Sequence, residues 1–571
     1  MMRTRPLLIS LLILIFPVLA LAQSGRGDAD GSLLPEINPQ DIEIRSEFQA
    51  RFPGLRRQPI LGFNPTPRVY QIDPNRLPFM ETPEDAVADV SVTELGRPEP
   101  PKRTILAIPD RINAYIRAGF GSFLTPEING YGYYELNEKS FLTANLNLSG
   151  SDGHLDYQES SFTFMDFDVK YYQKNTDKWR FMLEAGALSD QHYLFNTDGL
   201  NETPEKKNLG ASAKATIKKV DNVFQGFEAS LGGSIFESNL TINRPSIIYP
   251  ITGGEVSEKT YFANTMVFWP GSRLYETFKI SGQLDGGFYD NLTDDQQQWL
   301  DANAAIQYER LLNFTTRVSA KGGLEYISDP FSEKFYLVPE VEIKHNLSHA
   351  LSVSGNAFAK PEMQTIQDHH QFNRFLNIQT PLRHAYKIGA AGEVNYQLFE
   401  GNRFFGGLNY QHIKDYAYYQ RRIVTPGNIQ SFYDVNYANA NILEFYVGAI
   451  YQLVPDKFWA DAKIYARSPK LAAGGNIPYE EKIGVETAVS FKPLKELTIN
   501  GWTEYIGSRE SPETSSDLNA FFLLNAGAEY QINDTFGVYA KLLNILGQDY
   551  EIWSGYQERP FQIFGGVTIK F

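Results

Sequence analysis

The chain has no cysteine in its 571 residues. No disulfide can therefore stabilise it outside the cytoplasm, and it cannot be a bacterial lipoprotein, which needs a cysteine at its cleavage site. Long apolar runs are also missing beyond the N-terminus, where no stretch reaches the roughly 18 apolar residues of a membrane-spanning helix. Positive charge is scarce, because 52 Lys and Arg stand against 67 Asp and Glu. The net charge of −15 disfavours nucleic acid as a partner.

Residues 1–22 have the three parts of a secretory signal peptide. Two arginines begin the segment, Leu7–Leu19 is almost wholly apolar, and Ala20-Leu21-Ala22 supplies the small residues of a cleavage site. An uncleaved anchor is the alternative, but the apolar part is short for a membrane span. We therefore expect an exported chain that begins near Gln23.

Residues 23–110, which we call the arm, differ in composition from the rest. They hold thirteen of the 31 prolines, as in Arg97-Pro98-Glu99-Pro100-Pro101, and show no regular alternation. Because proline lacks the amide hydrogen that helices and sheets need, the arm is expected to be extended and largely irregular. We expect it either to hang in the periplasm or to lie against the lumen of the domain that follows.

From residue 111 to the end, apolar and polar residues alternate with a period of two. Leu142, Ala144, Leu146 and Leu148, for example, alternate with polar residues, and the pattern recurs at 112–121, 165–171, 211–218, 337–344, 351–359 and 458–466. This pattern is typical of β-strands with one apolar face. No domain boundary interrupts these roughly 460 residues, which exceed one β-sandwich.

The connections between these predicted strands are alternately short and long. The short ones lie near 137–139, 174–177, 220–223, 269–274, 310–313, 346–348, 399–401, 454–456, 492–496 and 533–535. The long ones lie near 150–160, 191–208, 238–255, 360–384, 416–442, 468–482, 506–519 and 546–560. Short periplasmic turns and long extracellular loops are typical of a membrane barrel. Residues 111–571 are therefore predicted to form an all-β, antiparallel, up-and-down transmembrane barrel of about 22 strands, in the outer membrane of a diderm bacterium.

The last predicted strand ends the chain with an aromatic residue. Phe561, Val567, Ile569 and Phe571 fall on one face of it. An apolar strand with a terminal aromatic looks like the signal that the bacterial barrel-assembly machinery recognises, and we assign these four residues to that signal. Because unpaired strand edges are costly in hydrocarbon, the last strand must pair with the first. The expected partners are outer-membrane lipid and, during biogenesis, the assembly machinery.

Both ends of the barrel region resemble the barrel of TonB-dependent receptors. The first hairpin has YIRAGFGSFLTP at 115–126, and the chain ends with LNILGQDY at 543–550, WSGY at 553–556 and FGGVTIKF at 564–571. Those receptors end in a similar way, with Asn-Leu-x-Asn, a Tyr, a Gly-Tyr and a terminal Phe. The resemblance, strongest to the plugless receptor-like barrels of Bacteroidota, implies a receptor or transport role for a solute and an energy-coupling or envelope partner.

The arm departs from that family. A TonB-dependent receptor has a folded plug ahead of its barrel, whereas the arm lacks the Gly-rich strands of a plug. Asp89–Leu95 faintly resembles a TonB box, although an acidic linker explains it more simply. Barrels of this width have plugged lumens, so we expect the arm, folded loops or a partner to obstruct this one.

No nucleophile elbow, phosphate loop or zinc-helix motif occurs, and we expect no enzyme activity, cofactor or resident metal. His369 and His370 could bind a metal, but adjacent residues of an extended loop point to opposite sides, so a loop role is the simpler interpretation. Tyrosine clusters at 131–134, 171–172 and 416–419 could stack on sugars, yet aromatic girdles at the membrane interfaces explain them more simply.

Charged residues on the polar faces of the strands are expected to line the lumen, where they pair among themselves or set pore selectivity. They are Asp166, Asp168, Lys170, Lys214, Glu340, Glu342 and Lys344. Two function classes remain: a receptor-like channel for a solute, or a structural scaffold or partner subunit of an outer-membrane assembly or export complex. The sequence names neither the solute nor its binding residues.

Overall fold

The computed structural model describes residues 114–571, apart from 156–158, 175–177, 196–202, 223–224, 242–252, 274, 291–295, 400, 426–427, 455–456 and 513–516. The predicted signal peptide (1–22) and arm (23–110), with its Asp89–Leu95 segment, lie outside the described residues. Among the described residues, no helix is long and apolar enough to cross a membrane.

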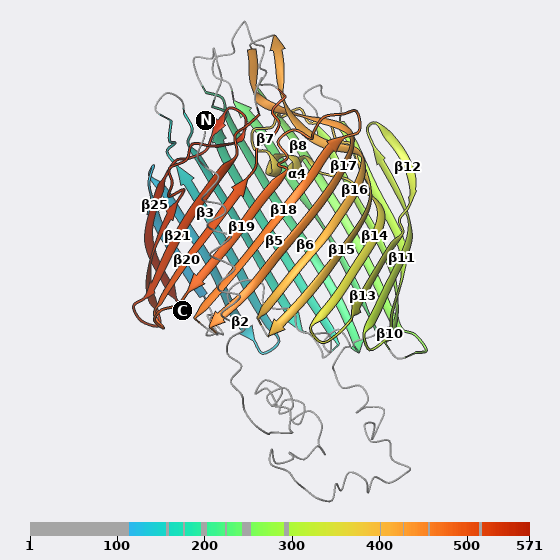
Figure 1. The fold of residues 1–571 in the computed structure, drawn as a ribbon. Helices are drawn as coiled ribbons and strands as arrows, with labels where there is room; N and C mark the ends of the chain where they lie inside the picture. The colour runs from blue at the N-terminus through green and yellow to red at the C-terminus, as the bar shows by residue number, and fades with distance from the viewer. Residues whose placement is uncertain are drawn as a thin grey trace, which may run out of the picture. The chain divides into compact units, whose positions relative to one another are not determined.

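The described chain forms a closed antiparallel β-barrel (Figure 1). Its strands are β1 Ala114–Gly121, β2 Thr125–Asn137, β3 Ser140–Ser151, β4 Phe162–Lys174, β5 Trp179–Tyr193, β6 Glu205–Asn222, β7 Gln225–Thr241, β8 Gly254–Pro270, β9 Glu276–Asp290, β10 Gln296–Asn313, β11 Thr316–Asp329, β12 Ser332–Leu337, β13 Glu340–Asn346, β14 Leu351–Glu362, β15 Ala385–Phe399, β16 Asn402–Thr425, β17 Asn428–Val454, β18 Phe458–Leu471, β19 Ile483–Phe491, β20 Leu497–Ile506, β21 Phe521–Gln531, β22 Phe536–Leu543 and β25 Gln562–Lys570. The helix α4 (Ile366–Phe372) and the hairpin of β23 (Glu551–Trp553) and β24 (Tyr556–Gln557) lie in loops.

The barrel has 22 strands, as predicted. β12 and β13 both pair with β11 and are separated only by Val338-Pro339, so they form one interrupted barrel strand. Closure is made by β25, which pairs with β1 from Tyr115 to Gly121. Beyond that ladder, Ala114 and Phe571 exchange backbone hydrogen bonds of 3.2 and 2.8 Å. The expected pairing of the last strand with the first is therefore confirmed, and the barrel presents no open edge to lipid.

The predicted short connections near 137–139, 310–313, 346–348, 492–496 and 533–535 are tight turns at one end of the barrel, and long connections such as 360–384 and 546–560 are loops at the other end (Figure 1). The other predicted short connections include residues outside the described ones. The prediction of a loop at 416–442 is wrong. β16 and β17 are 24 and 27 residues long and continue to pair through most of that segment, with Tyr416 opposite Ala438. The two halves of the segment pair with each other antiparallel, and Tyr433 also forms a bridge with Leu376 of the loop that follows β14.

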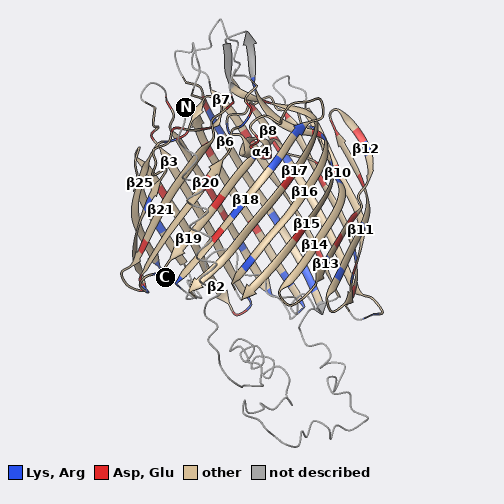
Figure 2. Ribbon diagram, viewed as in Figure 1, with Lys and Arg blue, Asp and Glu red and all other residues tan. Residues whose placement is uncertain are grey.

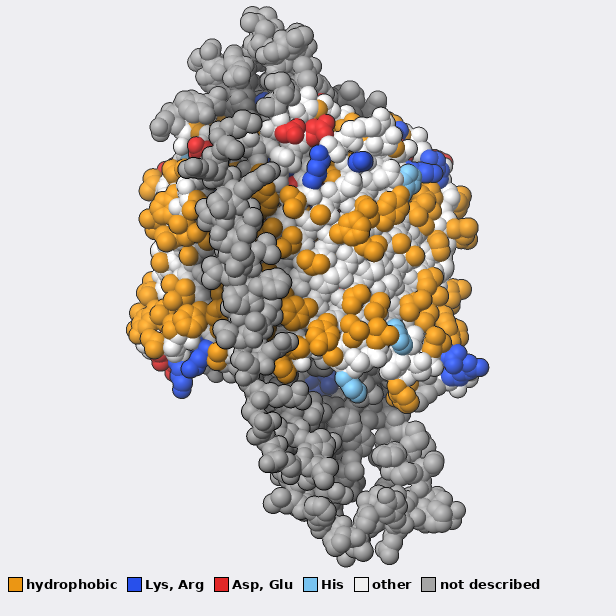
Figure 3. Space-filling model, in the orientation of Figure 1, with side chains coloured by type: hydrophobic (Ala, Val, Ile, Leu, Met, Phe, Trp, Pro, Cys, Tyr) orange, Lys and Arg blue, Asp and Glu red, His pale blue; other side chains and the backbone are white. Residues whose placement is uncertain are grey.

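Side chains on the outer face of the barrel are largely apolar. Leu183, Leu231, Ile306 and Leu324 are 54–65% exposed. Figure 3 shows apolar side chains over the height of the visible face, with charged side chains gathered near its two rims. An apolar belt of this extent is stable in lipid rather than in water. The protein is accordingly an integral outer-membrane β-barrel.

Charged residues of both signs occur along the barrel strands (Figure 2). Two of the residues predicted to line the lumen, Lys170 and Lys214, both face Glu184 across the ladder, at 3.8 and 3.3 Å. Asp168 accepts hydrogen bonds from the Asn145 amide at 3.0 and 3.1 Å. These three charges are thus paired with neighbouring strands, and Lys214 keeps a side chain 40% exposed. Glu340, Glu342 and Lys344 on β13 are exposed.

Candidate functional site

The loop-end mouth of the barrel is filled by residues 363–384, which connect β14 to β15 and which we call the loop plug. Its apolar residues Ile366, Leu376, Ile378 and Leu382 are at most 1% exposed. They belong to one buried cluster with wall residues that include Phe236, Tyr289, Trp299 and Tyr433. Of the obstructions that the sequence suggested, folded loops are therefore the one present among the described residues.

The loop plug begins with the short helix α4, which is held at its N-terminus by the barrel wall. Glu258 on β8 accepts hydrogen bonds from the backbone N–H of Ile366 at 2.8 Å and of Gln367 at 3.4 Å, and from Trp299 Nε1 at 3.1 Å. Thr365 caps the same turn in a capping box with Asp368. Two carboxylates thus satisfy amide groups that every helix leaves unpaired at its first turn.

Past the end of α4, a second wall residue holds the loop plug. The Nζ atom of Lys206, on β6, lies 2.8 Å from Nδ1 of His370, 3.0 Å from the carbonyl oxygen of Arg374 and 2.5 Å from that of Leu376. An ammonium has three hydrogens, and each one has an acceptor here. With the ammonium as donor, Nδ1 of His370 accepts, and the ring proton of a neutral His370 is assigned to Nε2. Lys206 is 0% exposed, so these three acceptors take the place of water around its Nζ atom.

The predicted extended conformation of Asp368-His369-His370 is wrong, because these residues lie in α4. Both histidines are buried, and Nδ1 of His369 lies 2.9 Å from the hydroxyl of Tyr419 on β16. Burial lowers the pKa of His369 from 6.5 to about 4, and burial together with the nearby Lys206 charge lowers the pKa of His370 further. Among the described residues, no group of three His, Asp or Glu side chains is placed to hold a metal ion.

The far end of the loop plug is anchored on β11 and β12. The backbone N–H of His384 donates to Oδ2 of Asp329 at 3.0 Å, and its Nδ1 lies 2.5 Å from the same oxygen. The hydroxyl of Tyr336 lies 2.7 Å from the other ring nitrogen of His384. The fixed imidazole ties the end of the loop plug to the wall.

A second loop, 544–561, covers the loop plug and carries the β23–β24 hairpin. Tyr556 is fully buried, and its ring stacks on Phe375 with centroids 3.5 Å apart. The hydroxyl of Tyr433 donates to the carbonyl oxygen of Ser554 at 2.8 Å. The two loops therefore form one packed layer across the mouth.

The interpretation of the tyrosine clusters as membrane girdles is only partly right. Tyr134 faces outward and is 66% exposed, as a girdle residue would be. The ring of its neighbour Tyr133 packs instead on the ring of Phe141, with the centroids 5.2 Å apart. Tyr419 is only 7% exposed and belongs to the buried cluster of the mouth, 5.7 Å from Trp553. Alternation sends adjacent tyrosines to opposite faces, and the length of β16 raises Tyr419 into the loop layer.

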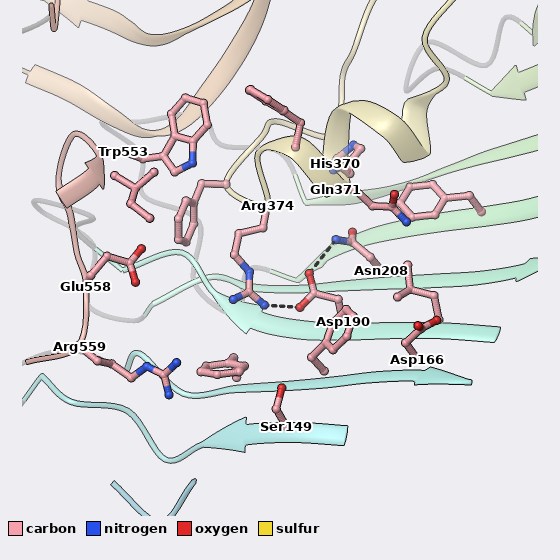
Figure 4. Close-up of a pocket in the computed structure, with 17 residues that line it drawn as sticks. Ser149, Asp166, Asp190, Asn208, His370, Gln371, Arg374, Trp553, Glu558 and Arg559 are labelled. Carbon is pink, nitrogen blue, oxygen red and sulfur yellow. Dashed lines mark hydrogen bonds and ion pairs between the residues drawn. The ribbon is translucent and has the colours of Figure 1, made fainter. Parts of the chain in front are cut away.

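A cavity of about 750 Å³ lies between the loop plug, the loop 544–561 and the inner wall formed by β3 to β7 (Figure 4). Its lining is half aromatic or aliphatic and half polar: Ser149, Phe162, Phe164, Asp166, Leu188, Asp190, Asn208, Phe236, His370, Gln371, Phe372, Arg374, Phe375, Ile552, Trp553, Glu558 and Arg559. This volume lies within the range of small-molecule sites, so the cavity is the candidate binding site.

Two arginines lie over the same ring at the edge of this cavity. The guanidinium carbons of Arg374 and Arg559 lie 5.1 and 5.0 Å from the ring centroid of Phe162. Arg374 forms an ion pair with Asp190, whose other oxygen lies 3.3 Å from Nδ1 of His192. Arg559 makes no ion pair among the described residues, and its Nη1 atom is buried without a hydrogen-bond partner there.

Sequence reasoning singled out Asp166 and His370 but missed Arg374, Asp190 and Arg559. Asp190 continues the period-two polar face of β5, which is a signal available in the sequence. The two arginines lie in irregular loops, where no spacing indicates which way a side chain points.

The residues assigned to the assembly signal lie on β25 or beside it. Phe561, Val567 and Phe571 are 38%, 46% and 64% exposed, and Ile569 shares their face of the strand. Their outward position agrees with the predicted lipid face, while their role in assembly stays a prediction.

No family model matches the chain, and no curated protein matches it. Solved structures of TonB-dependent receptors share its fold. The FrpB iron transporter from Neisseria meningitidis is 10% identical, with a TM-score of 0.64 over 81% of this chain and 82% of that one. The ferric-catecholate import receptor Fiu from E. coli K12 is 10% identical, with a TM-score of 0.61 over 81% and 82%. The copper transporter OprC is 13% identical, with a TM-score of 0.62 over 81% of each chain.

Proposed function

We propose that the protein is an outer-membrane receptor-type channel, which takes a small solute from outside through its lumen, with the loop plug as its gate. The observation that carries this proposal is the attachment of the loop plug to the inner wall. Glu258, Lys206 and Asp329 each hold it through direct hydrogen bonds. A loop that is held by the wall, and not by covalent crosslinks, can close the mouth at rest and move when a ligand shifts the equilibrium.

The cavity beneath the loops supports a binding step before passage. It lies against the inner wall, and Gln371 and Phe372 of α4 remain exposed toward it, with Phe372 61% exposed. The import and transport roles of Fiu, FrpB and OprC favour the same function class. The proposal assigns no catalytic step to the chain.

The proposed function also includes energy coupling across the envelope. It rests on the resemblance to TonB-dependent receptors and on Asp89–Leu95, which lies outside the described residues. Deleting residues 89–95 should abolish energised uptake of a solute while leaving bilayer conductance unchanged. Uptake that persists after the deletion would remove this part of the proposal and leave the channel itself.

An engineered, reducible disulfide tests whether the loop plug acts as a gate. Because the chain has no cysteine, Asn377→Cys combined with Asp434→Cys adds the only thiols, at positions where the native side chains are hydrogen-bonded at 3.1 Å. We expect the oxidised protein to be silent in a planar bilayer, and we expect openings to appear after reduction.

The matched control is Thr487→Cys with Thr503→Cys, a pair on β19 and β20 whose hydroxyls lie 2.7 Å apart and which does not touch the loop plug. Oxidation of the control should leave conductance unchanged. The alternative function, a scaffold in an outer-membrane assembly or export complex, predicts silence in both redox states and a stable co-purifying partner.

A further inference from the structure

The cavity beneath the loop plug contains two hydrogen-bond donors without acceptors. Nη1 of Arg559 and Nε2 of His370 are both buried and have no partner among the described residues. His370 is 2% exposed, and with the Lys206 ammonium as donor to Nδ1 its ring proton is assigned to Nε2. A buried donor without an acceptor is destabilising, so two at one cavity favour a ligand rich in acceptor oxygens.

The charges around the cavity favour one anionic group over several. Arg374 is already paired with Asp190, which leaves Arg559 as the cation without an ion pair. Glu558 lies beside Arg559 in the chain, but no ion pair joins the two side chains in Figure 4, and burial raises the pKa of Glu558. Asp166 and Phe162 lie on the same face of β4. They are four residues apart, which is about 13 Å along a strand that rises 3.3 Å per residue. A single negative charge therefore fits at Arg559, and a second would have no free cation.

The apolar part of the lining is largely aromatic. Phe162, Phe164, Phe372 and Trp553 line the same space, and Ile552 is 42% exposed beside them. A planar carboxylate matches one edge of a guanidinium with two parallel hydrogen bonds, whereas a dianionic phosphate would call for further cations. Aromatic rings stabilise an apolar body by stacking and by burial.

We propose that this cavity binds a small amphipathic carboxylate, with its acid group at Arg559 and its apolar body among the rings of Phe162, Phe372 and Trp553. This ligand class rests on the proposed function, because it supposes that the cavity lies on the path of the transported solute. Binding and passage are separable measurements, so each can fail without the other.

The test compares matched probes on the purified full-length protein by isothermal titration calorimetry. 4-Phenylbutyrate should bind at least tenfold more tightly than 4-phenylbutanol, which has the same body without the charge. Phenyl phosphate should bind no more tightly than 4-phenylbutyrate. Equal affinity for acid and alcohol would overturn the proposal, and a tenfold preference for phenyl phosphate would show that the ligand class is wrong.

Substitutions test whether Arg559 is the residue that binds the carboxylate of the ligand. Arg559→Gln should lower the affinity for 4-phenylbutyrate at least tenfold and leave that for 4-phenylbutanol unchanged, while Arg559→Lys should be intermediate. Arg403→Gln is the control, because Arg403 is paired with Glu393 on the inner wall and does not line the cavity. Unheated gel mobility checks that each barrel is folded. An unchanged affinity in folded Arg559→Gln would refute the proposal.

The proposed function is tested separately by flux of 4-phenylbutyrate into proteoliposomes. Binding without flux would leave the carboxylate site in place and contradict the channel. Flux with no preference between acid and alcohol would support the channel and contradict the site.

Discussion

The carboxylate of Glu258 on β8 accepts a hydrogen bond of 2.8 Å from the backbone N–H of Ile366, at the start of α4. These residues are 108 positions apart in the chain, and both are at most 1% exposed. The contact joins the barrel wall to the N-terminus of a helix, where the first backbone N–H groups have no acceptor within the helix. It therefore ties the position of the loop plug to the barrel itself.

Replacing Glu258 by Ala should loosen the loop plug without unfolding the barrel. The change leaves the amides of Ile366 and Gln367 and Trp299 Nε1 without their acceptor. A net loss of about 2 kcal/mol corresponds to roughly 30-fold faster hydrogen exchange in α4. Glu228→Ala, which removes an inner-wall partner of Lys218 only, should leave that exchange unchanged. Equal protection in both variants would show that Glu258 does not hold the helix.

Replacing Lys206 by Met should increase the open time of the channel. Methionine fills a similar volume but donates no hydrogen bond, so the carbonyls of Arg374 and Leu376 lose their donor. Bilayer recordings should show more frequent openings than in the wild type. Lys214→Met is the matched control, since Lys214 pairs with Glu184 and lies away from the loop plug. If both variants open equally often, Lys206 does not hold the loop plug in its closed position.

Acid should loosen the loop plug through His369. Its pKa is about 4 in the folded loop and 6.5 when exposed, so the unfolded loop binds the proton more readily. The stabilisation is complete above pH 6.5 and is lost as the pH falls toward 4, a difference of about 3 kcal/mol. Open probability should rise over that window, and His369→Gln should flatten the rise. A profile that is the same in both proteins would assign the effect to another group.

Replacing Phe571 by Asp should slow insertion far more than it destabilises the finished barrel. Phe571 is 64% exposed, and a charge near the interface costs only about 0–1 kcal/mol. Phe536→Asp is the control, because Phe536 is 49% exposed and starts β22 opposite Ile569 at the same end. Pulse-chase appearance of the heat-modifiable form measures the rate. Equal rates for the two variants would contradict the assembly signal.

The barrel was predictable from the sequence because alternation in a barrel strand is a local property. Leu142, Ala144, Leu146 and Leu148 each depend only on their neighbours for their direction. Strand number, closure and the short turns follow from the same local pattern. The loop plug was not predictable, because its contacts are made across the lumen: Lys206 meets Leu376, 170 residues away. Nothing near either residue in the sequence indicates that they meet.

Of the residues that line the cavity, those on strands were predictable from the sequence and those in loops were not. Asp166 lies on a strand and was correctly expected on the inner face. Arg559 comes from a loop and reaches Phe162 on β4 only because Tyr556, in the same loop, stacks on Phe375 of the loop plug. The position of such a residue depends on how two loops pack, and this information is absent from any single segment.

The direct hydrogen bonds between Ala114 and Phe571 mean that the ladder has no intrinsic first strand. A circular permutant of residues 114–571 that joins these two residues through a short linker, and opens instead at the turn 347–350 between β13 and β14, would contain the same 22 pairings. Its new ends would lie among the same set of short turns. Phe571 would then be internal, which separates its contribution as a lipid-facing side chain from its contribution as the end of the polypeptide. Thermodynamically the permutant should be close to the original barrel, and any deficit in its biogenesis would be attributable to the order of synthesis.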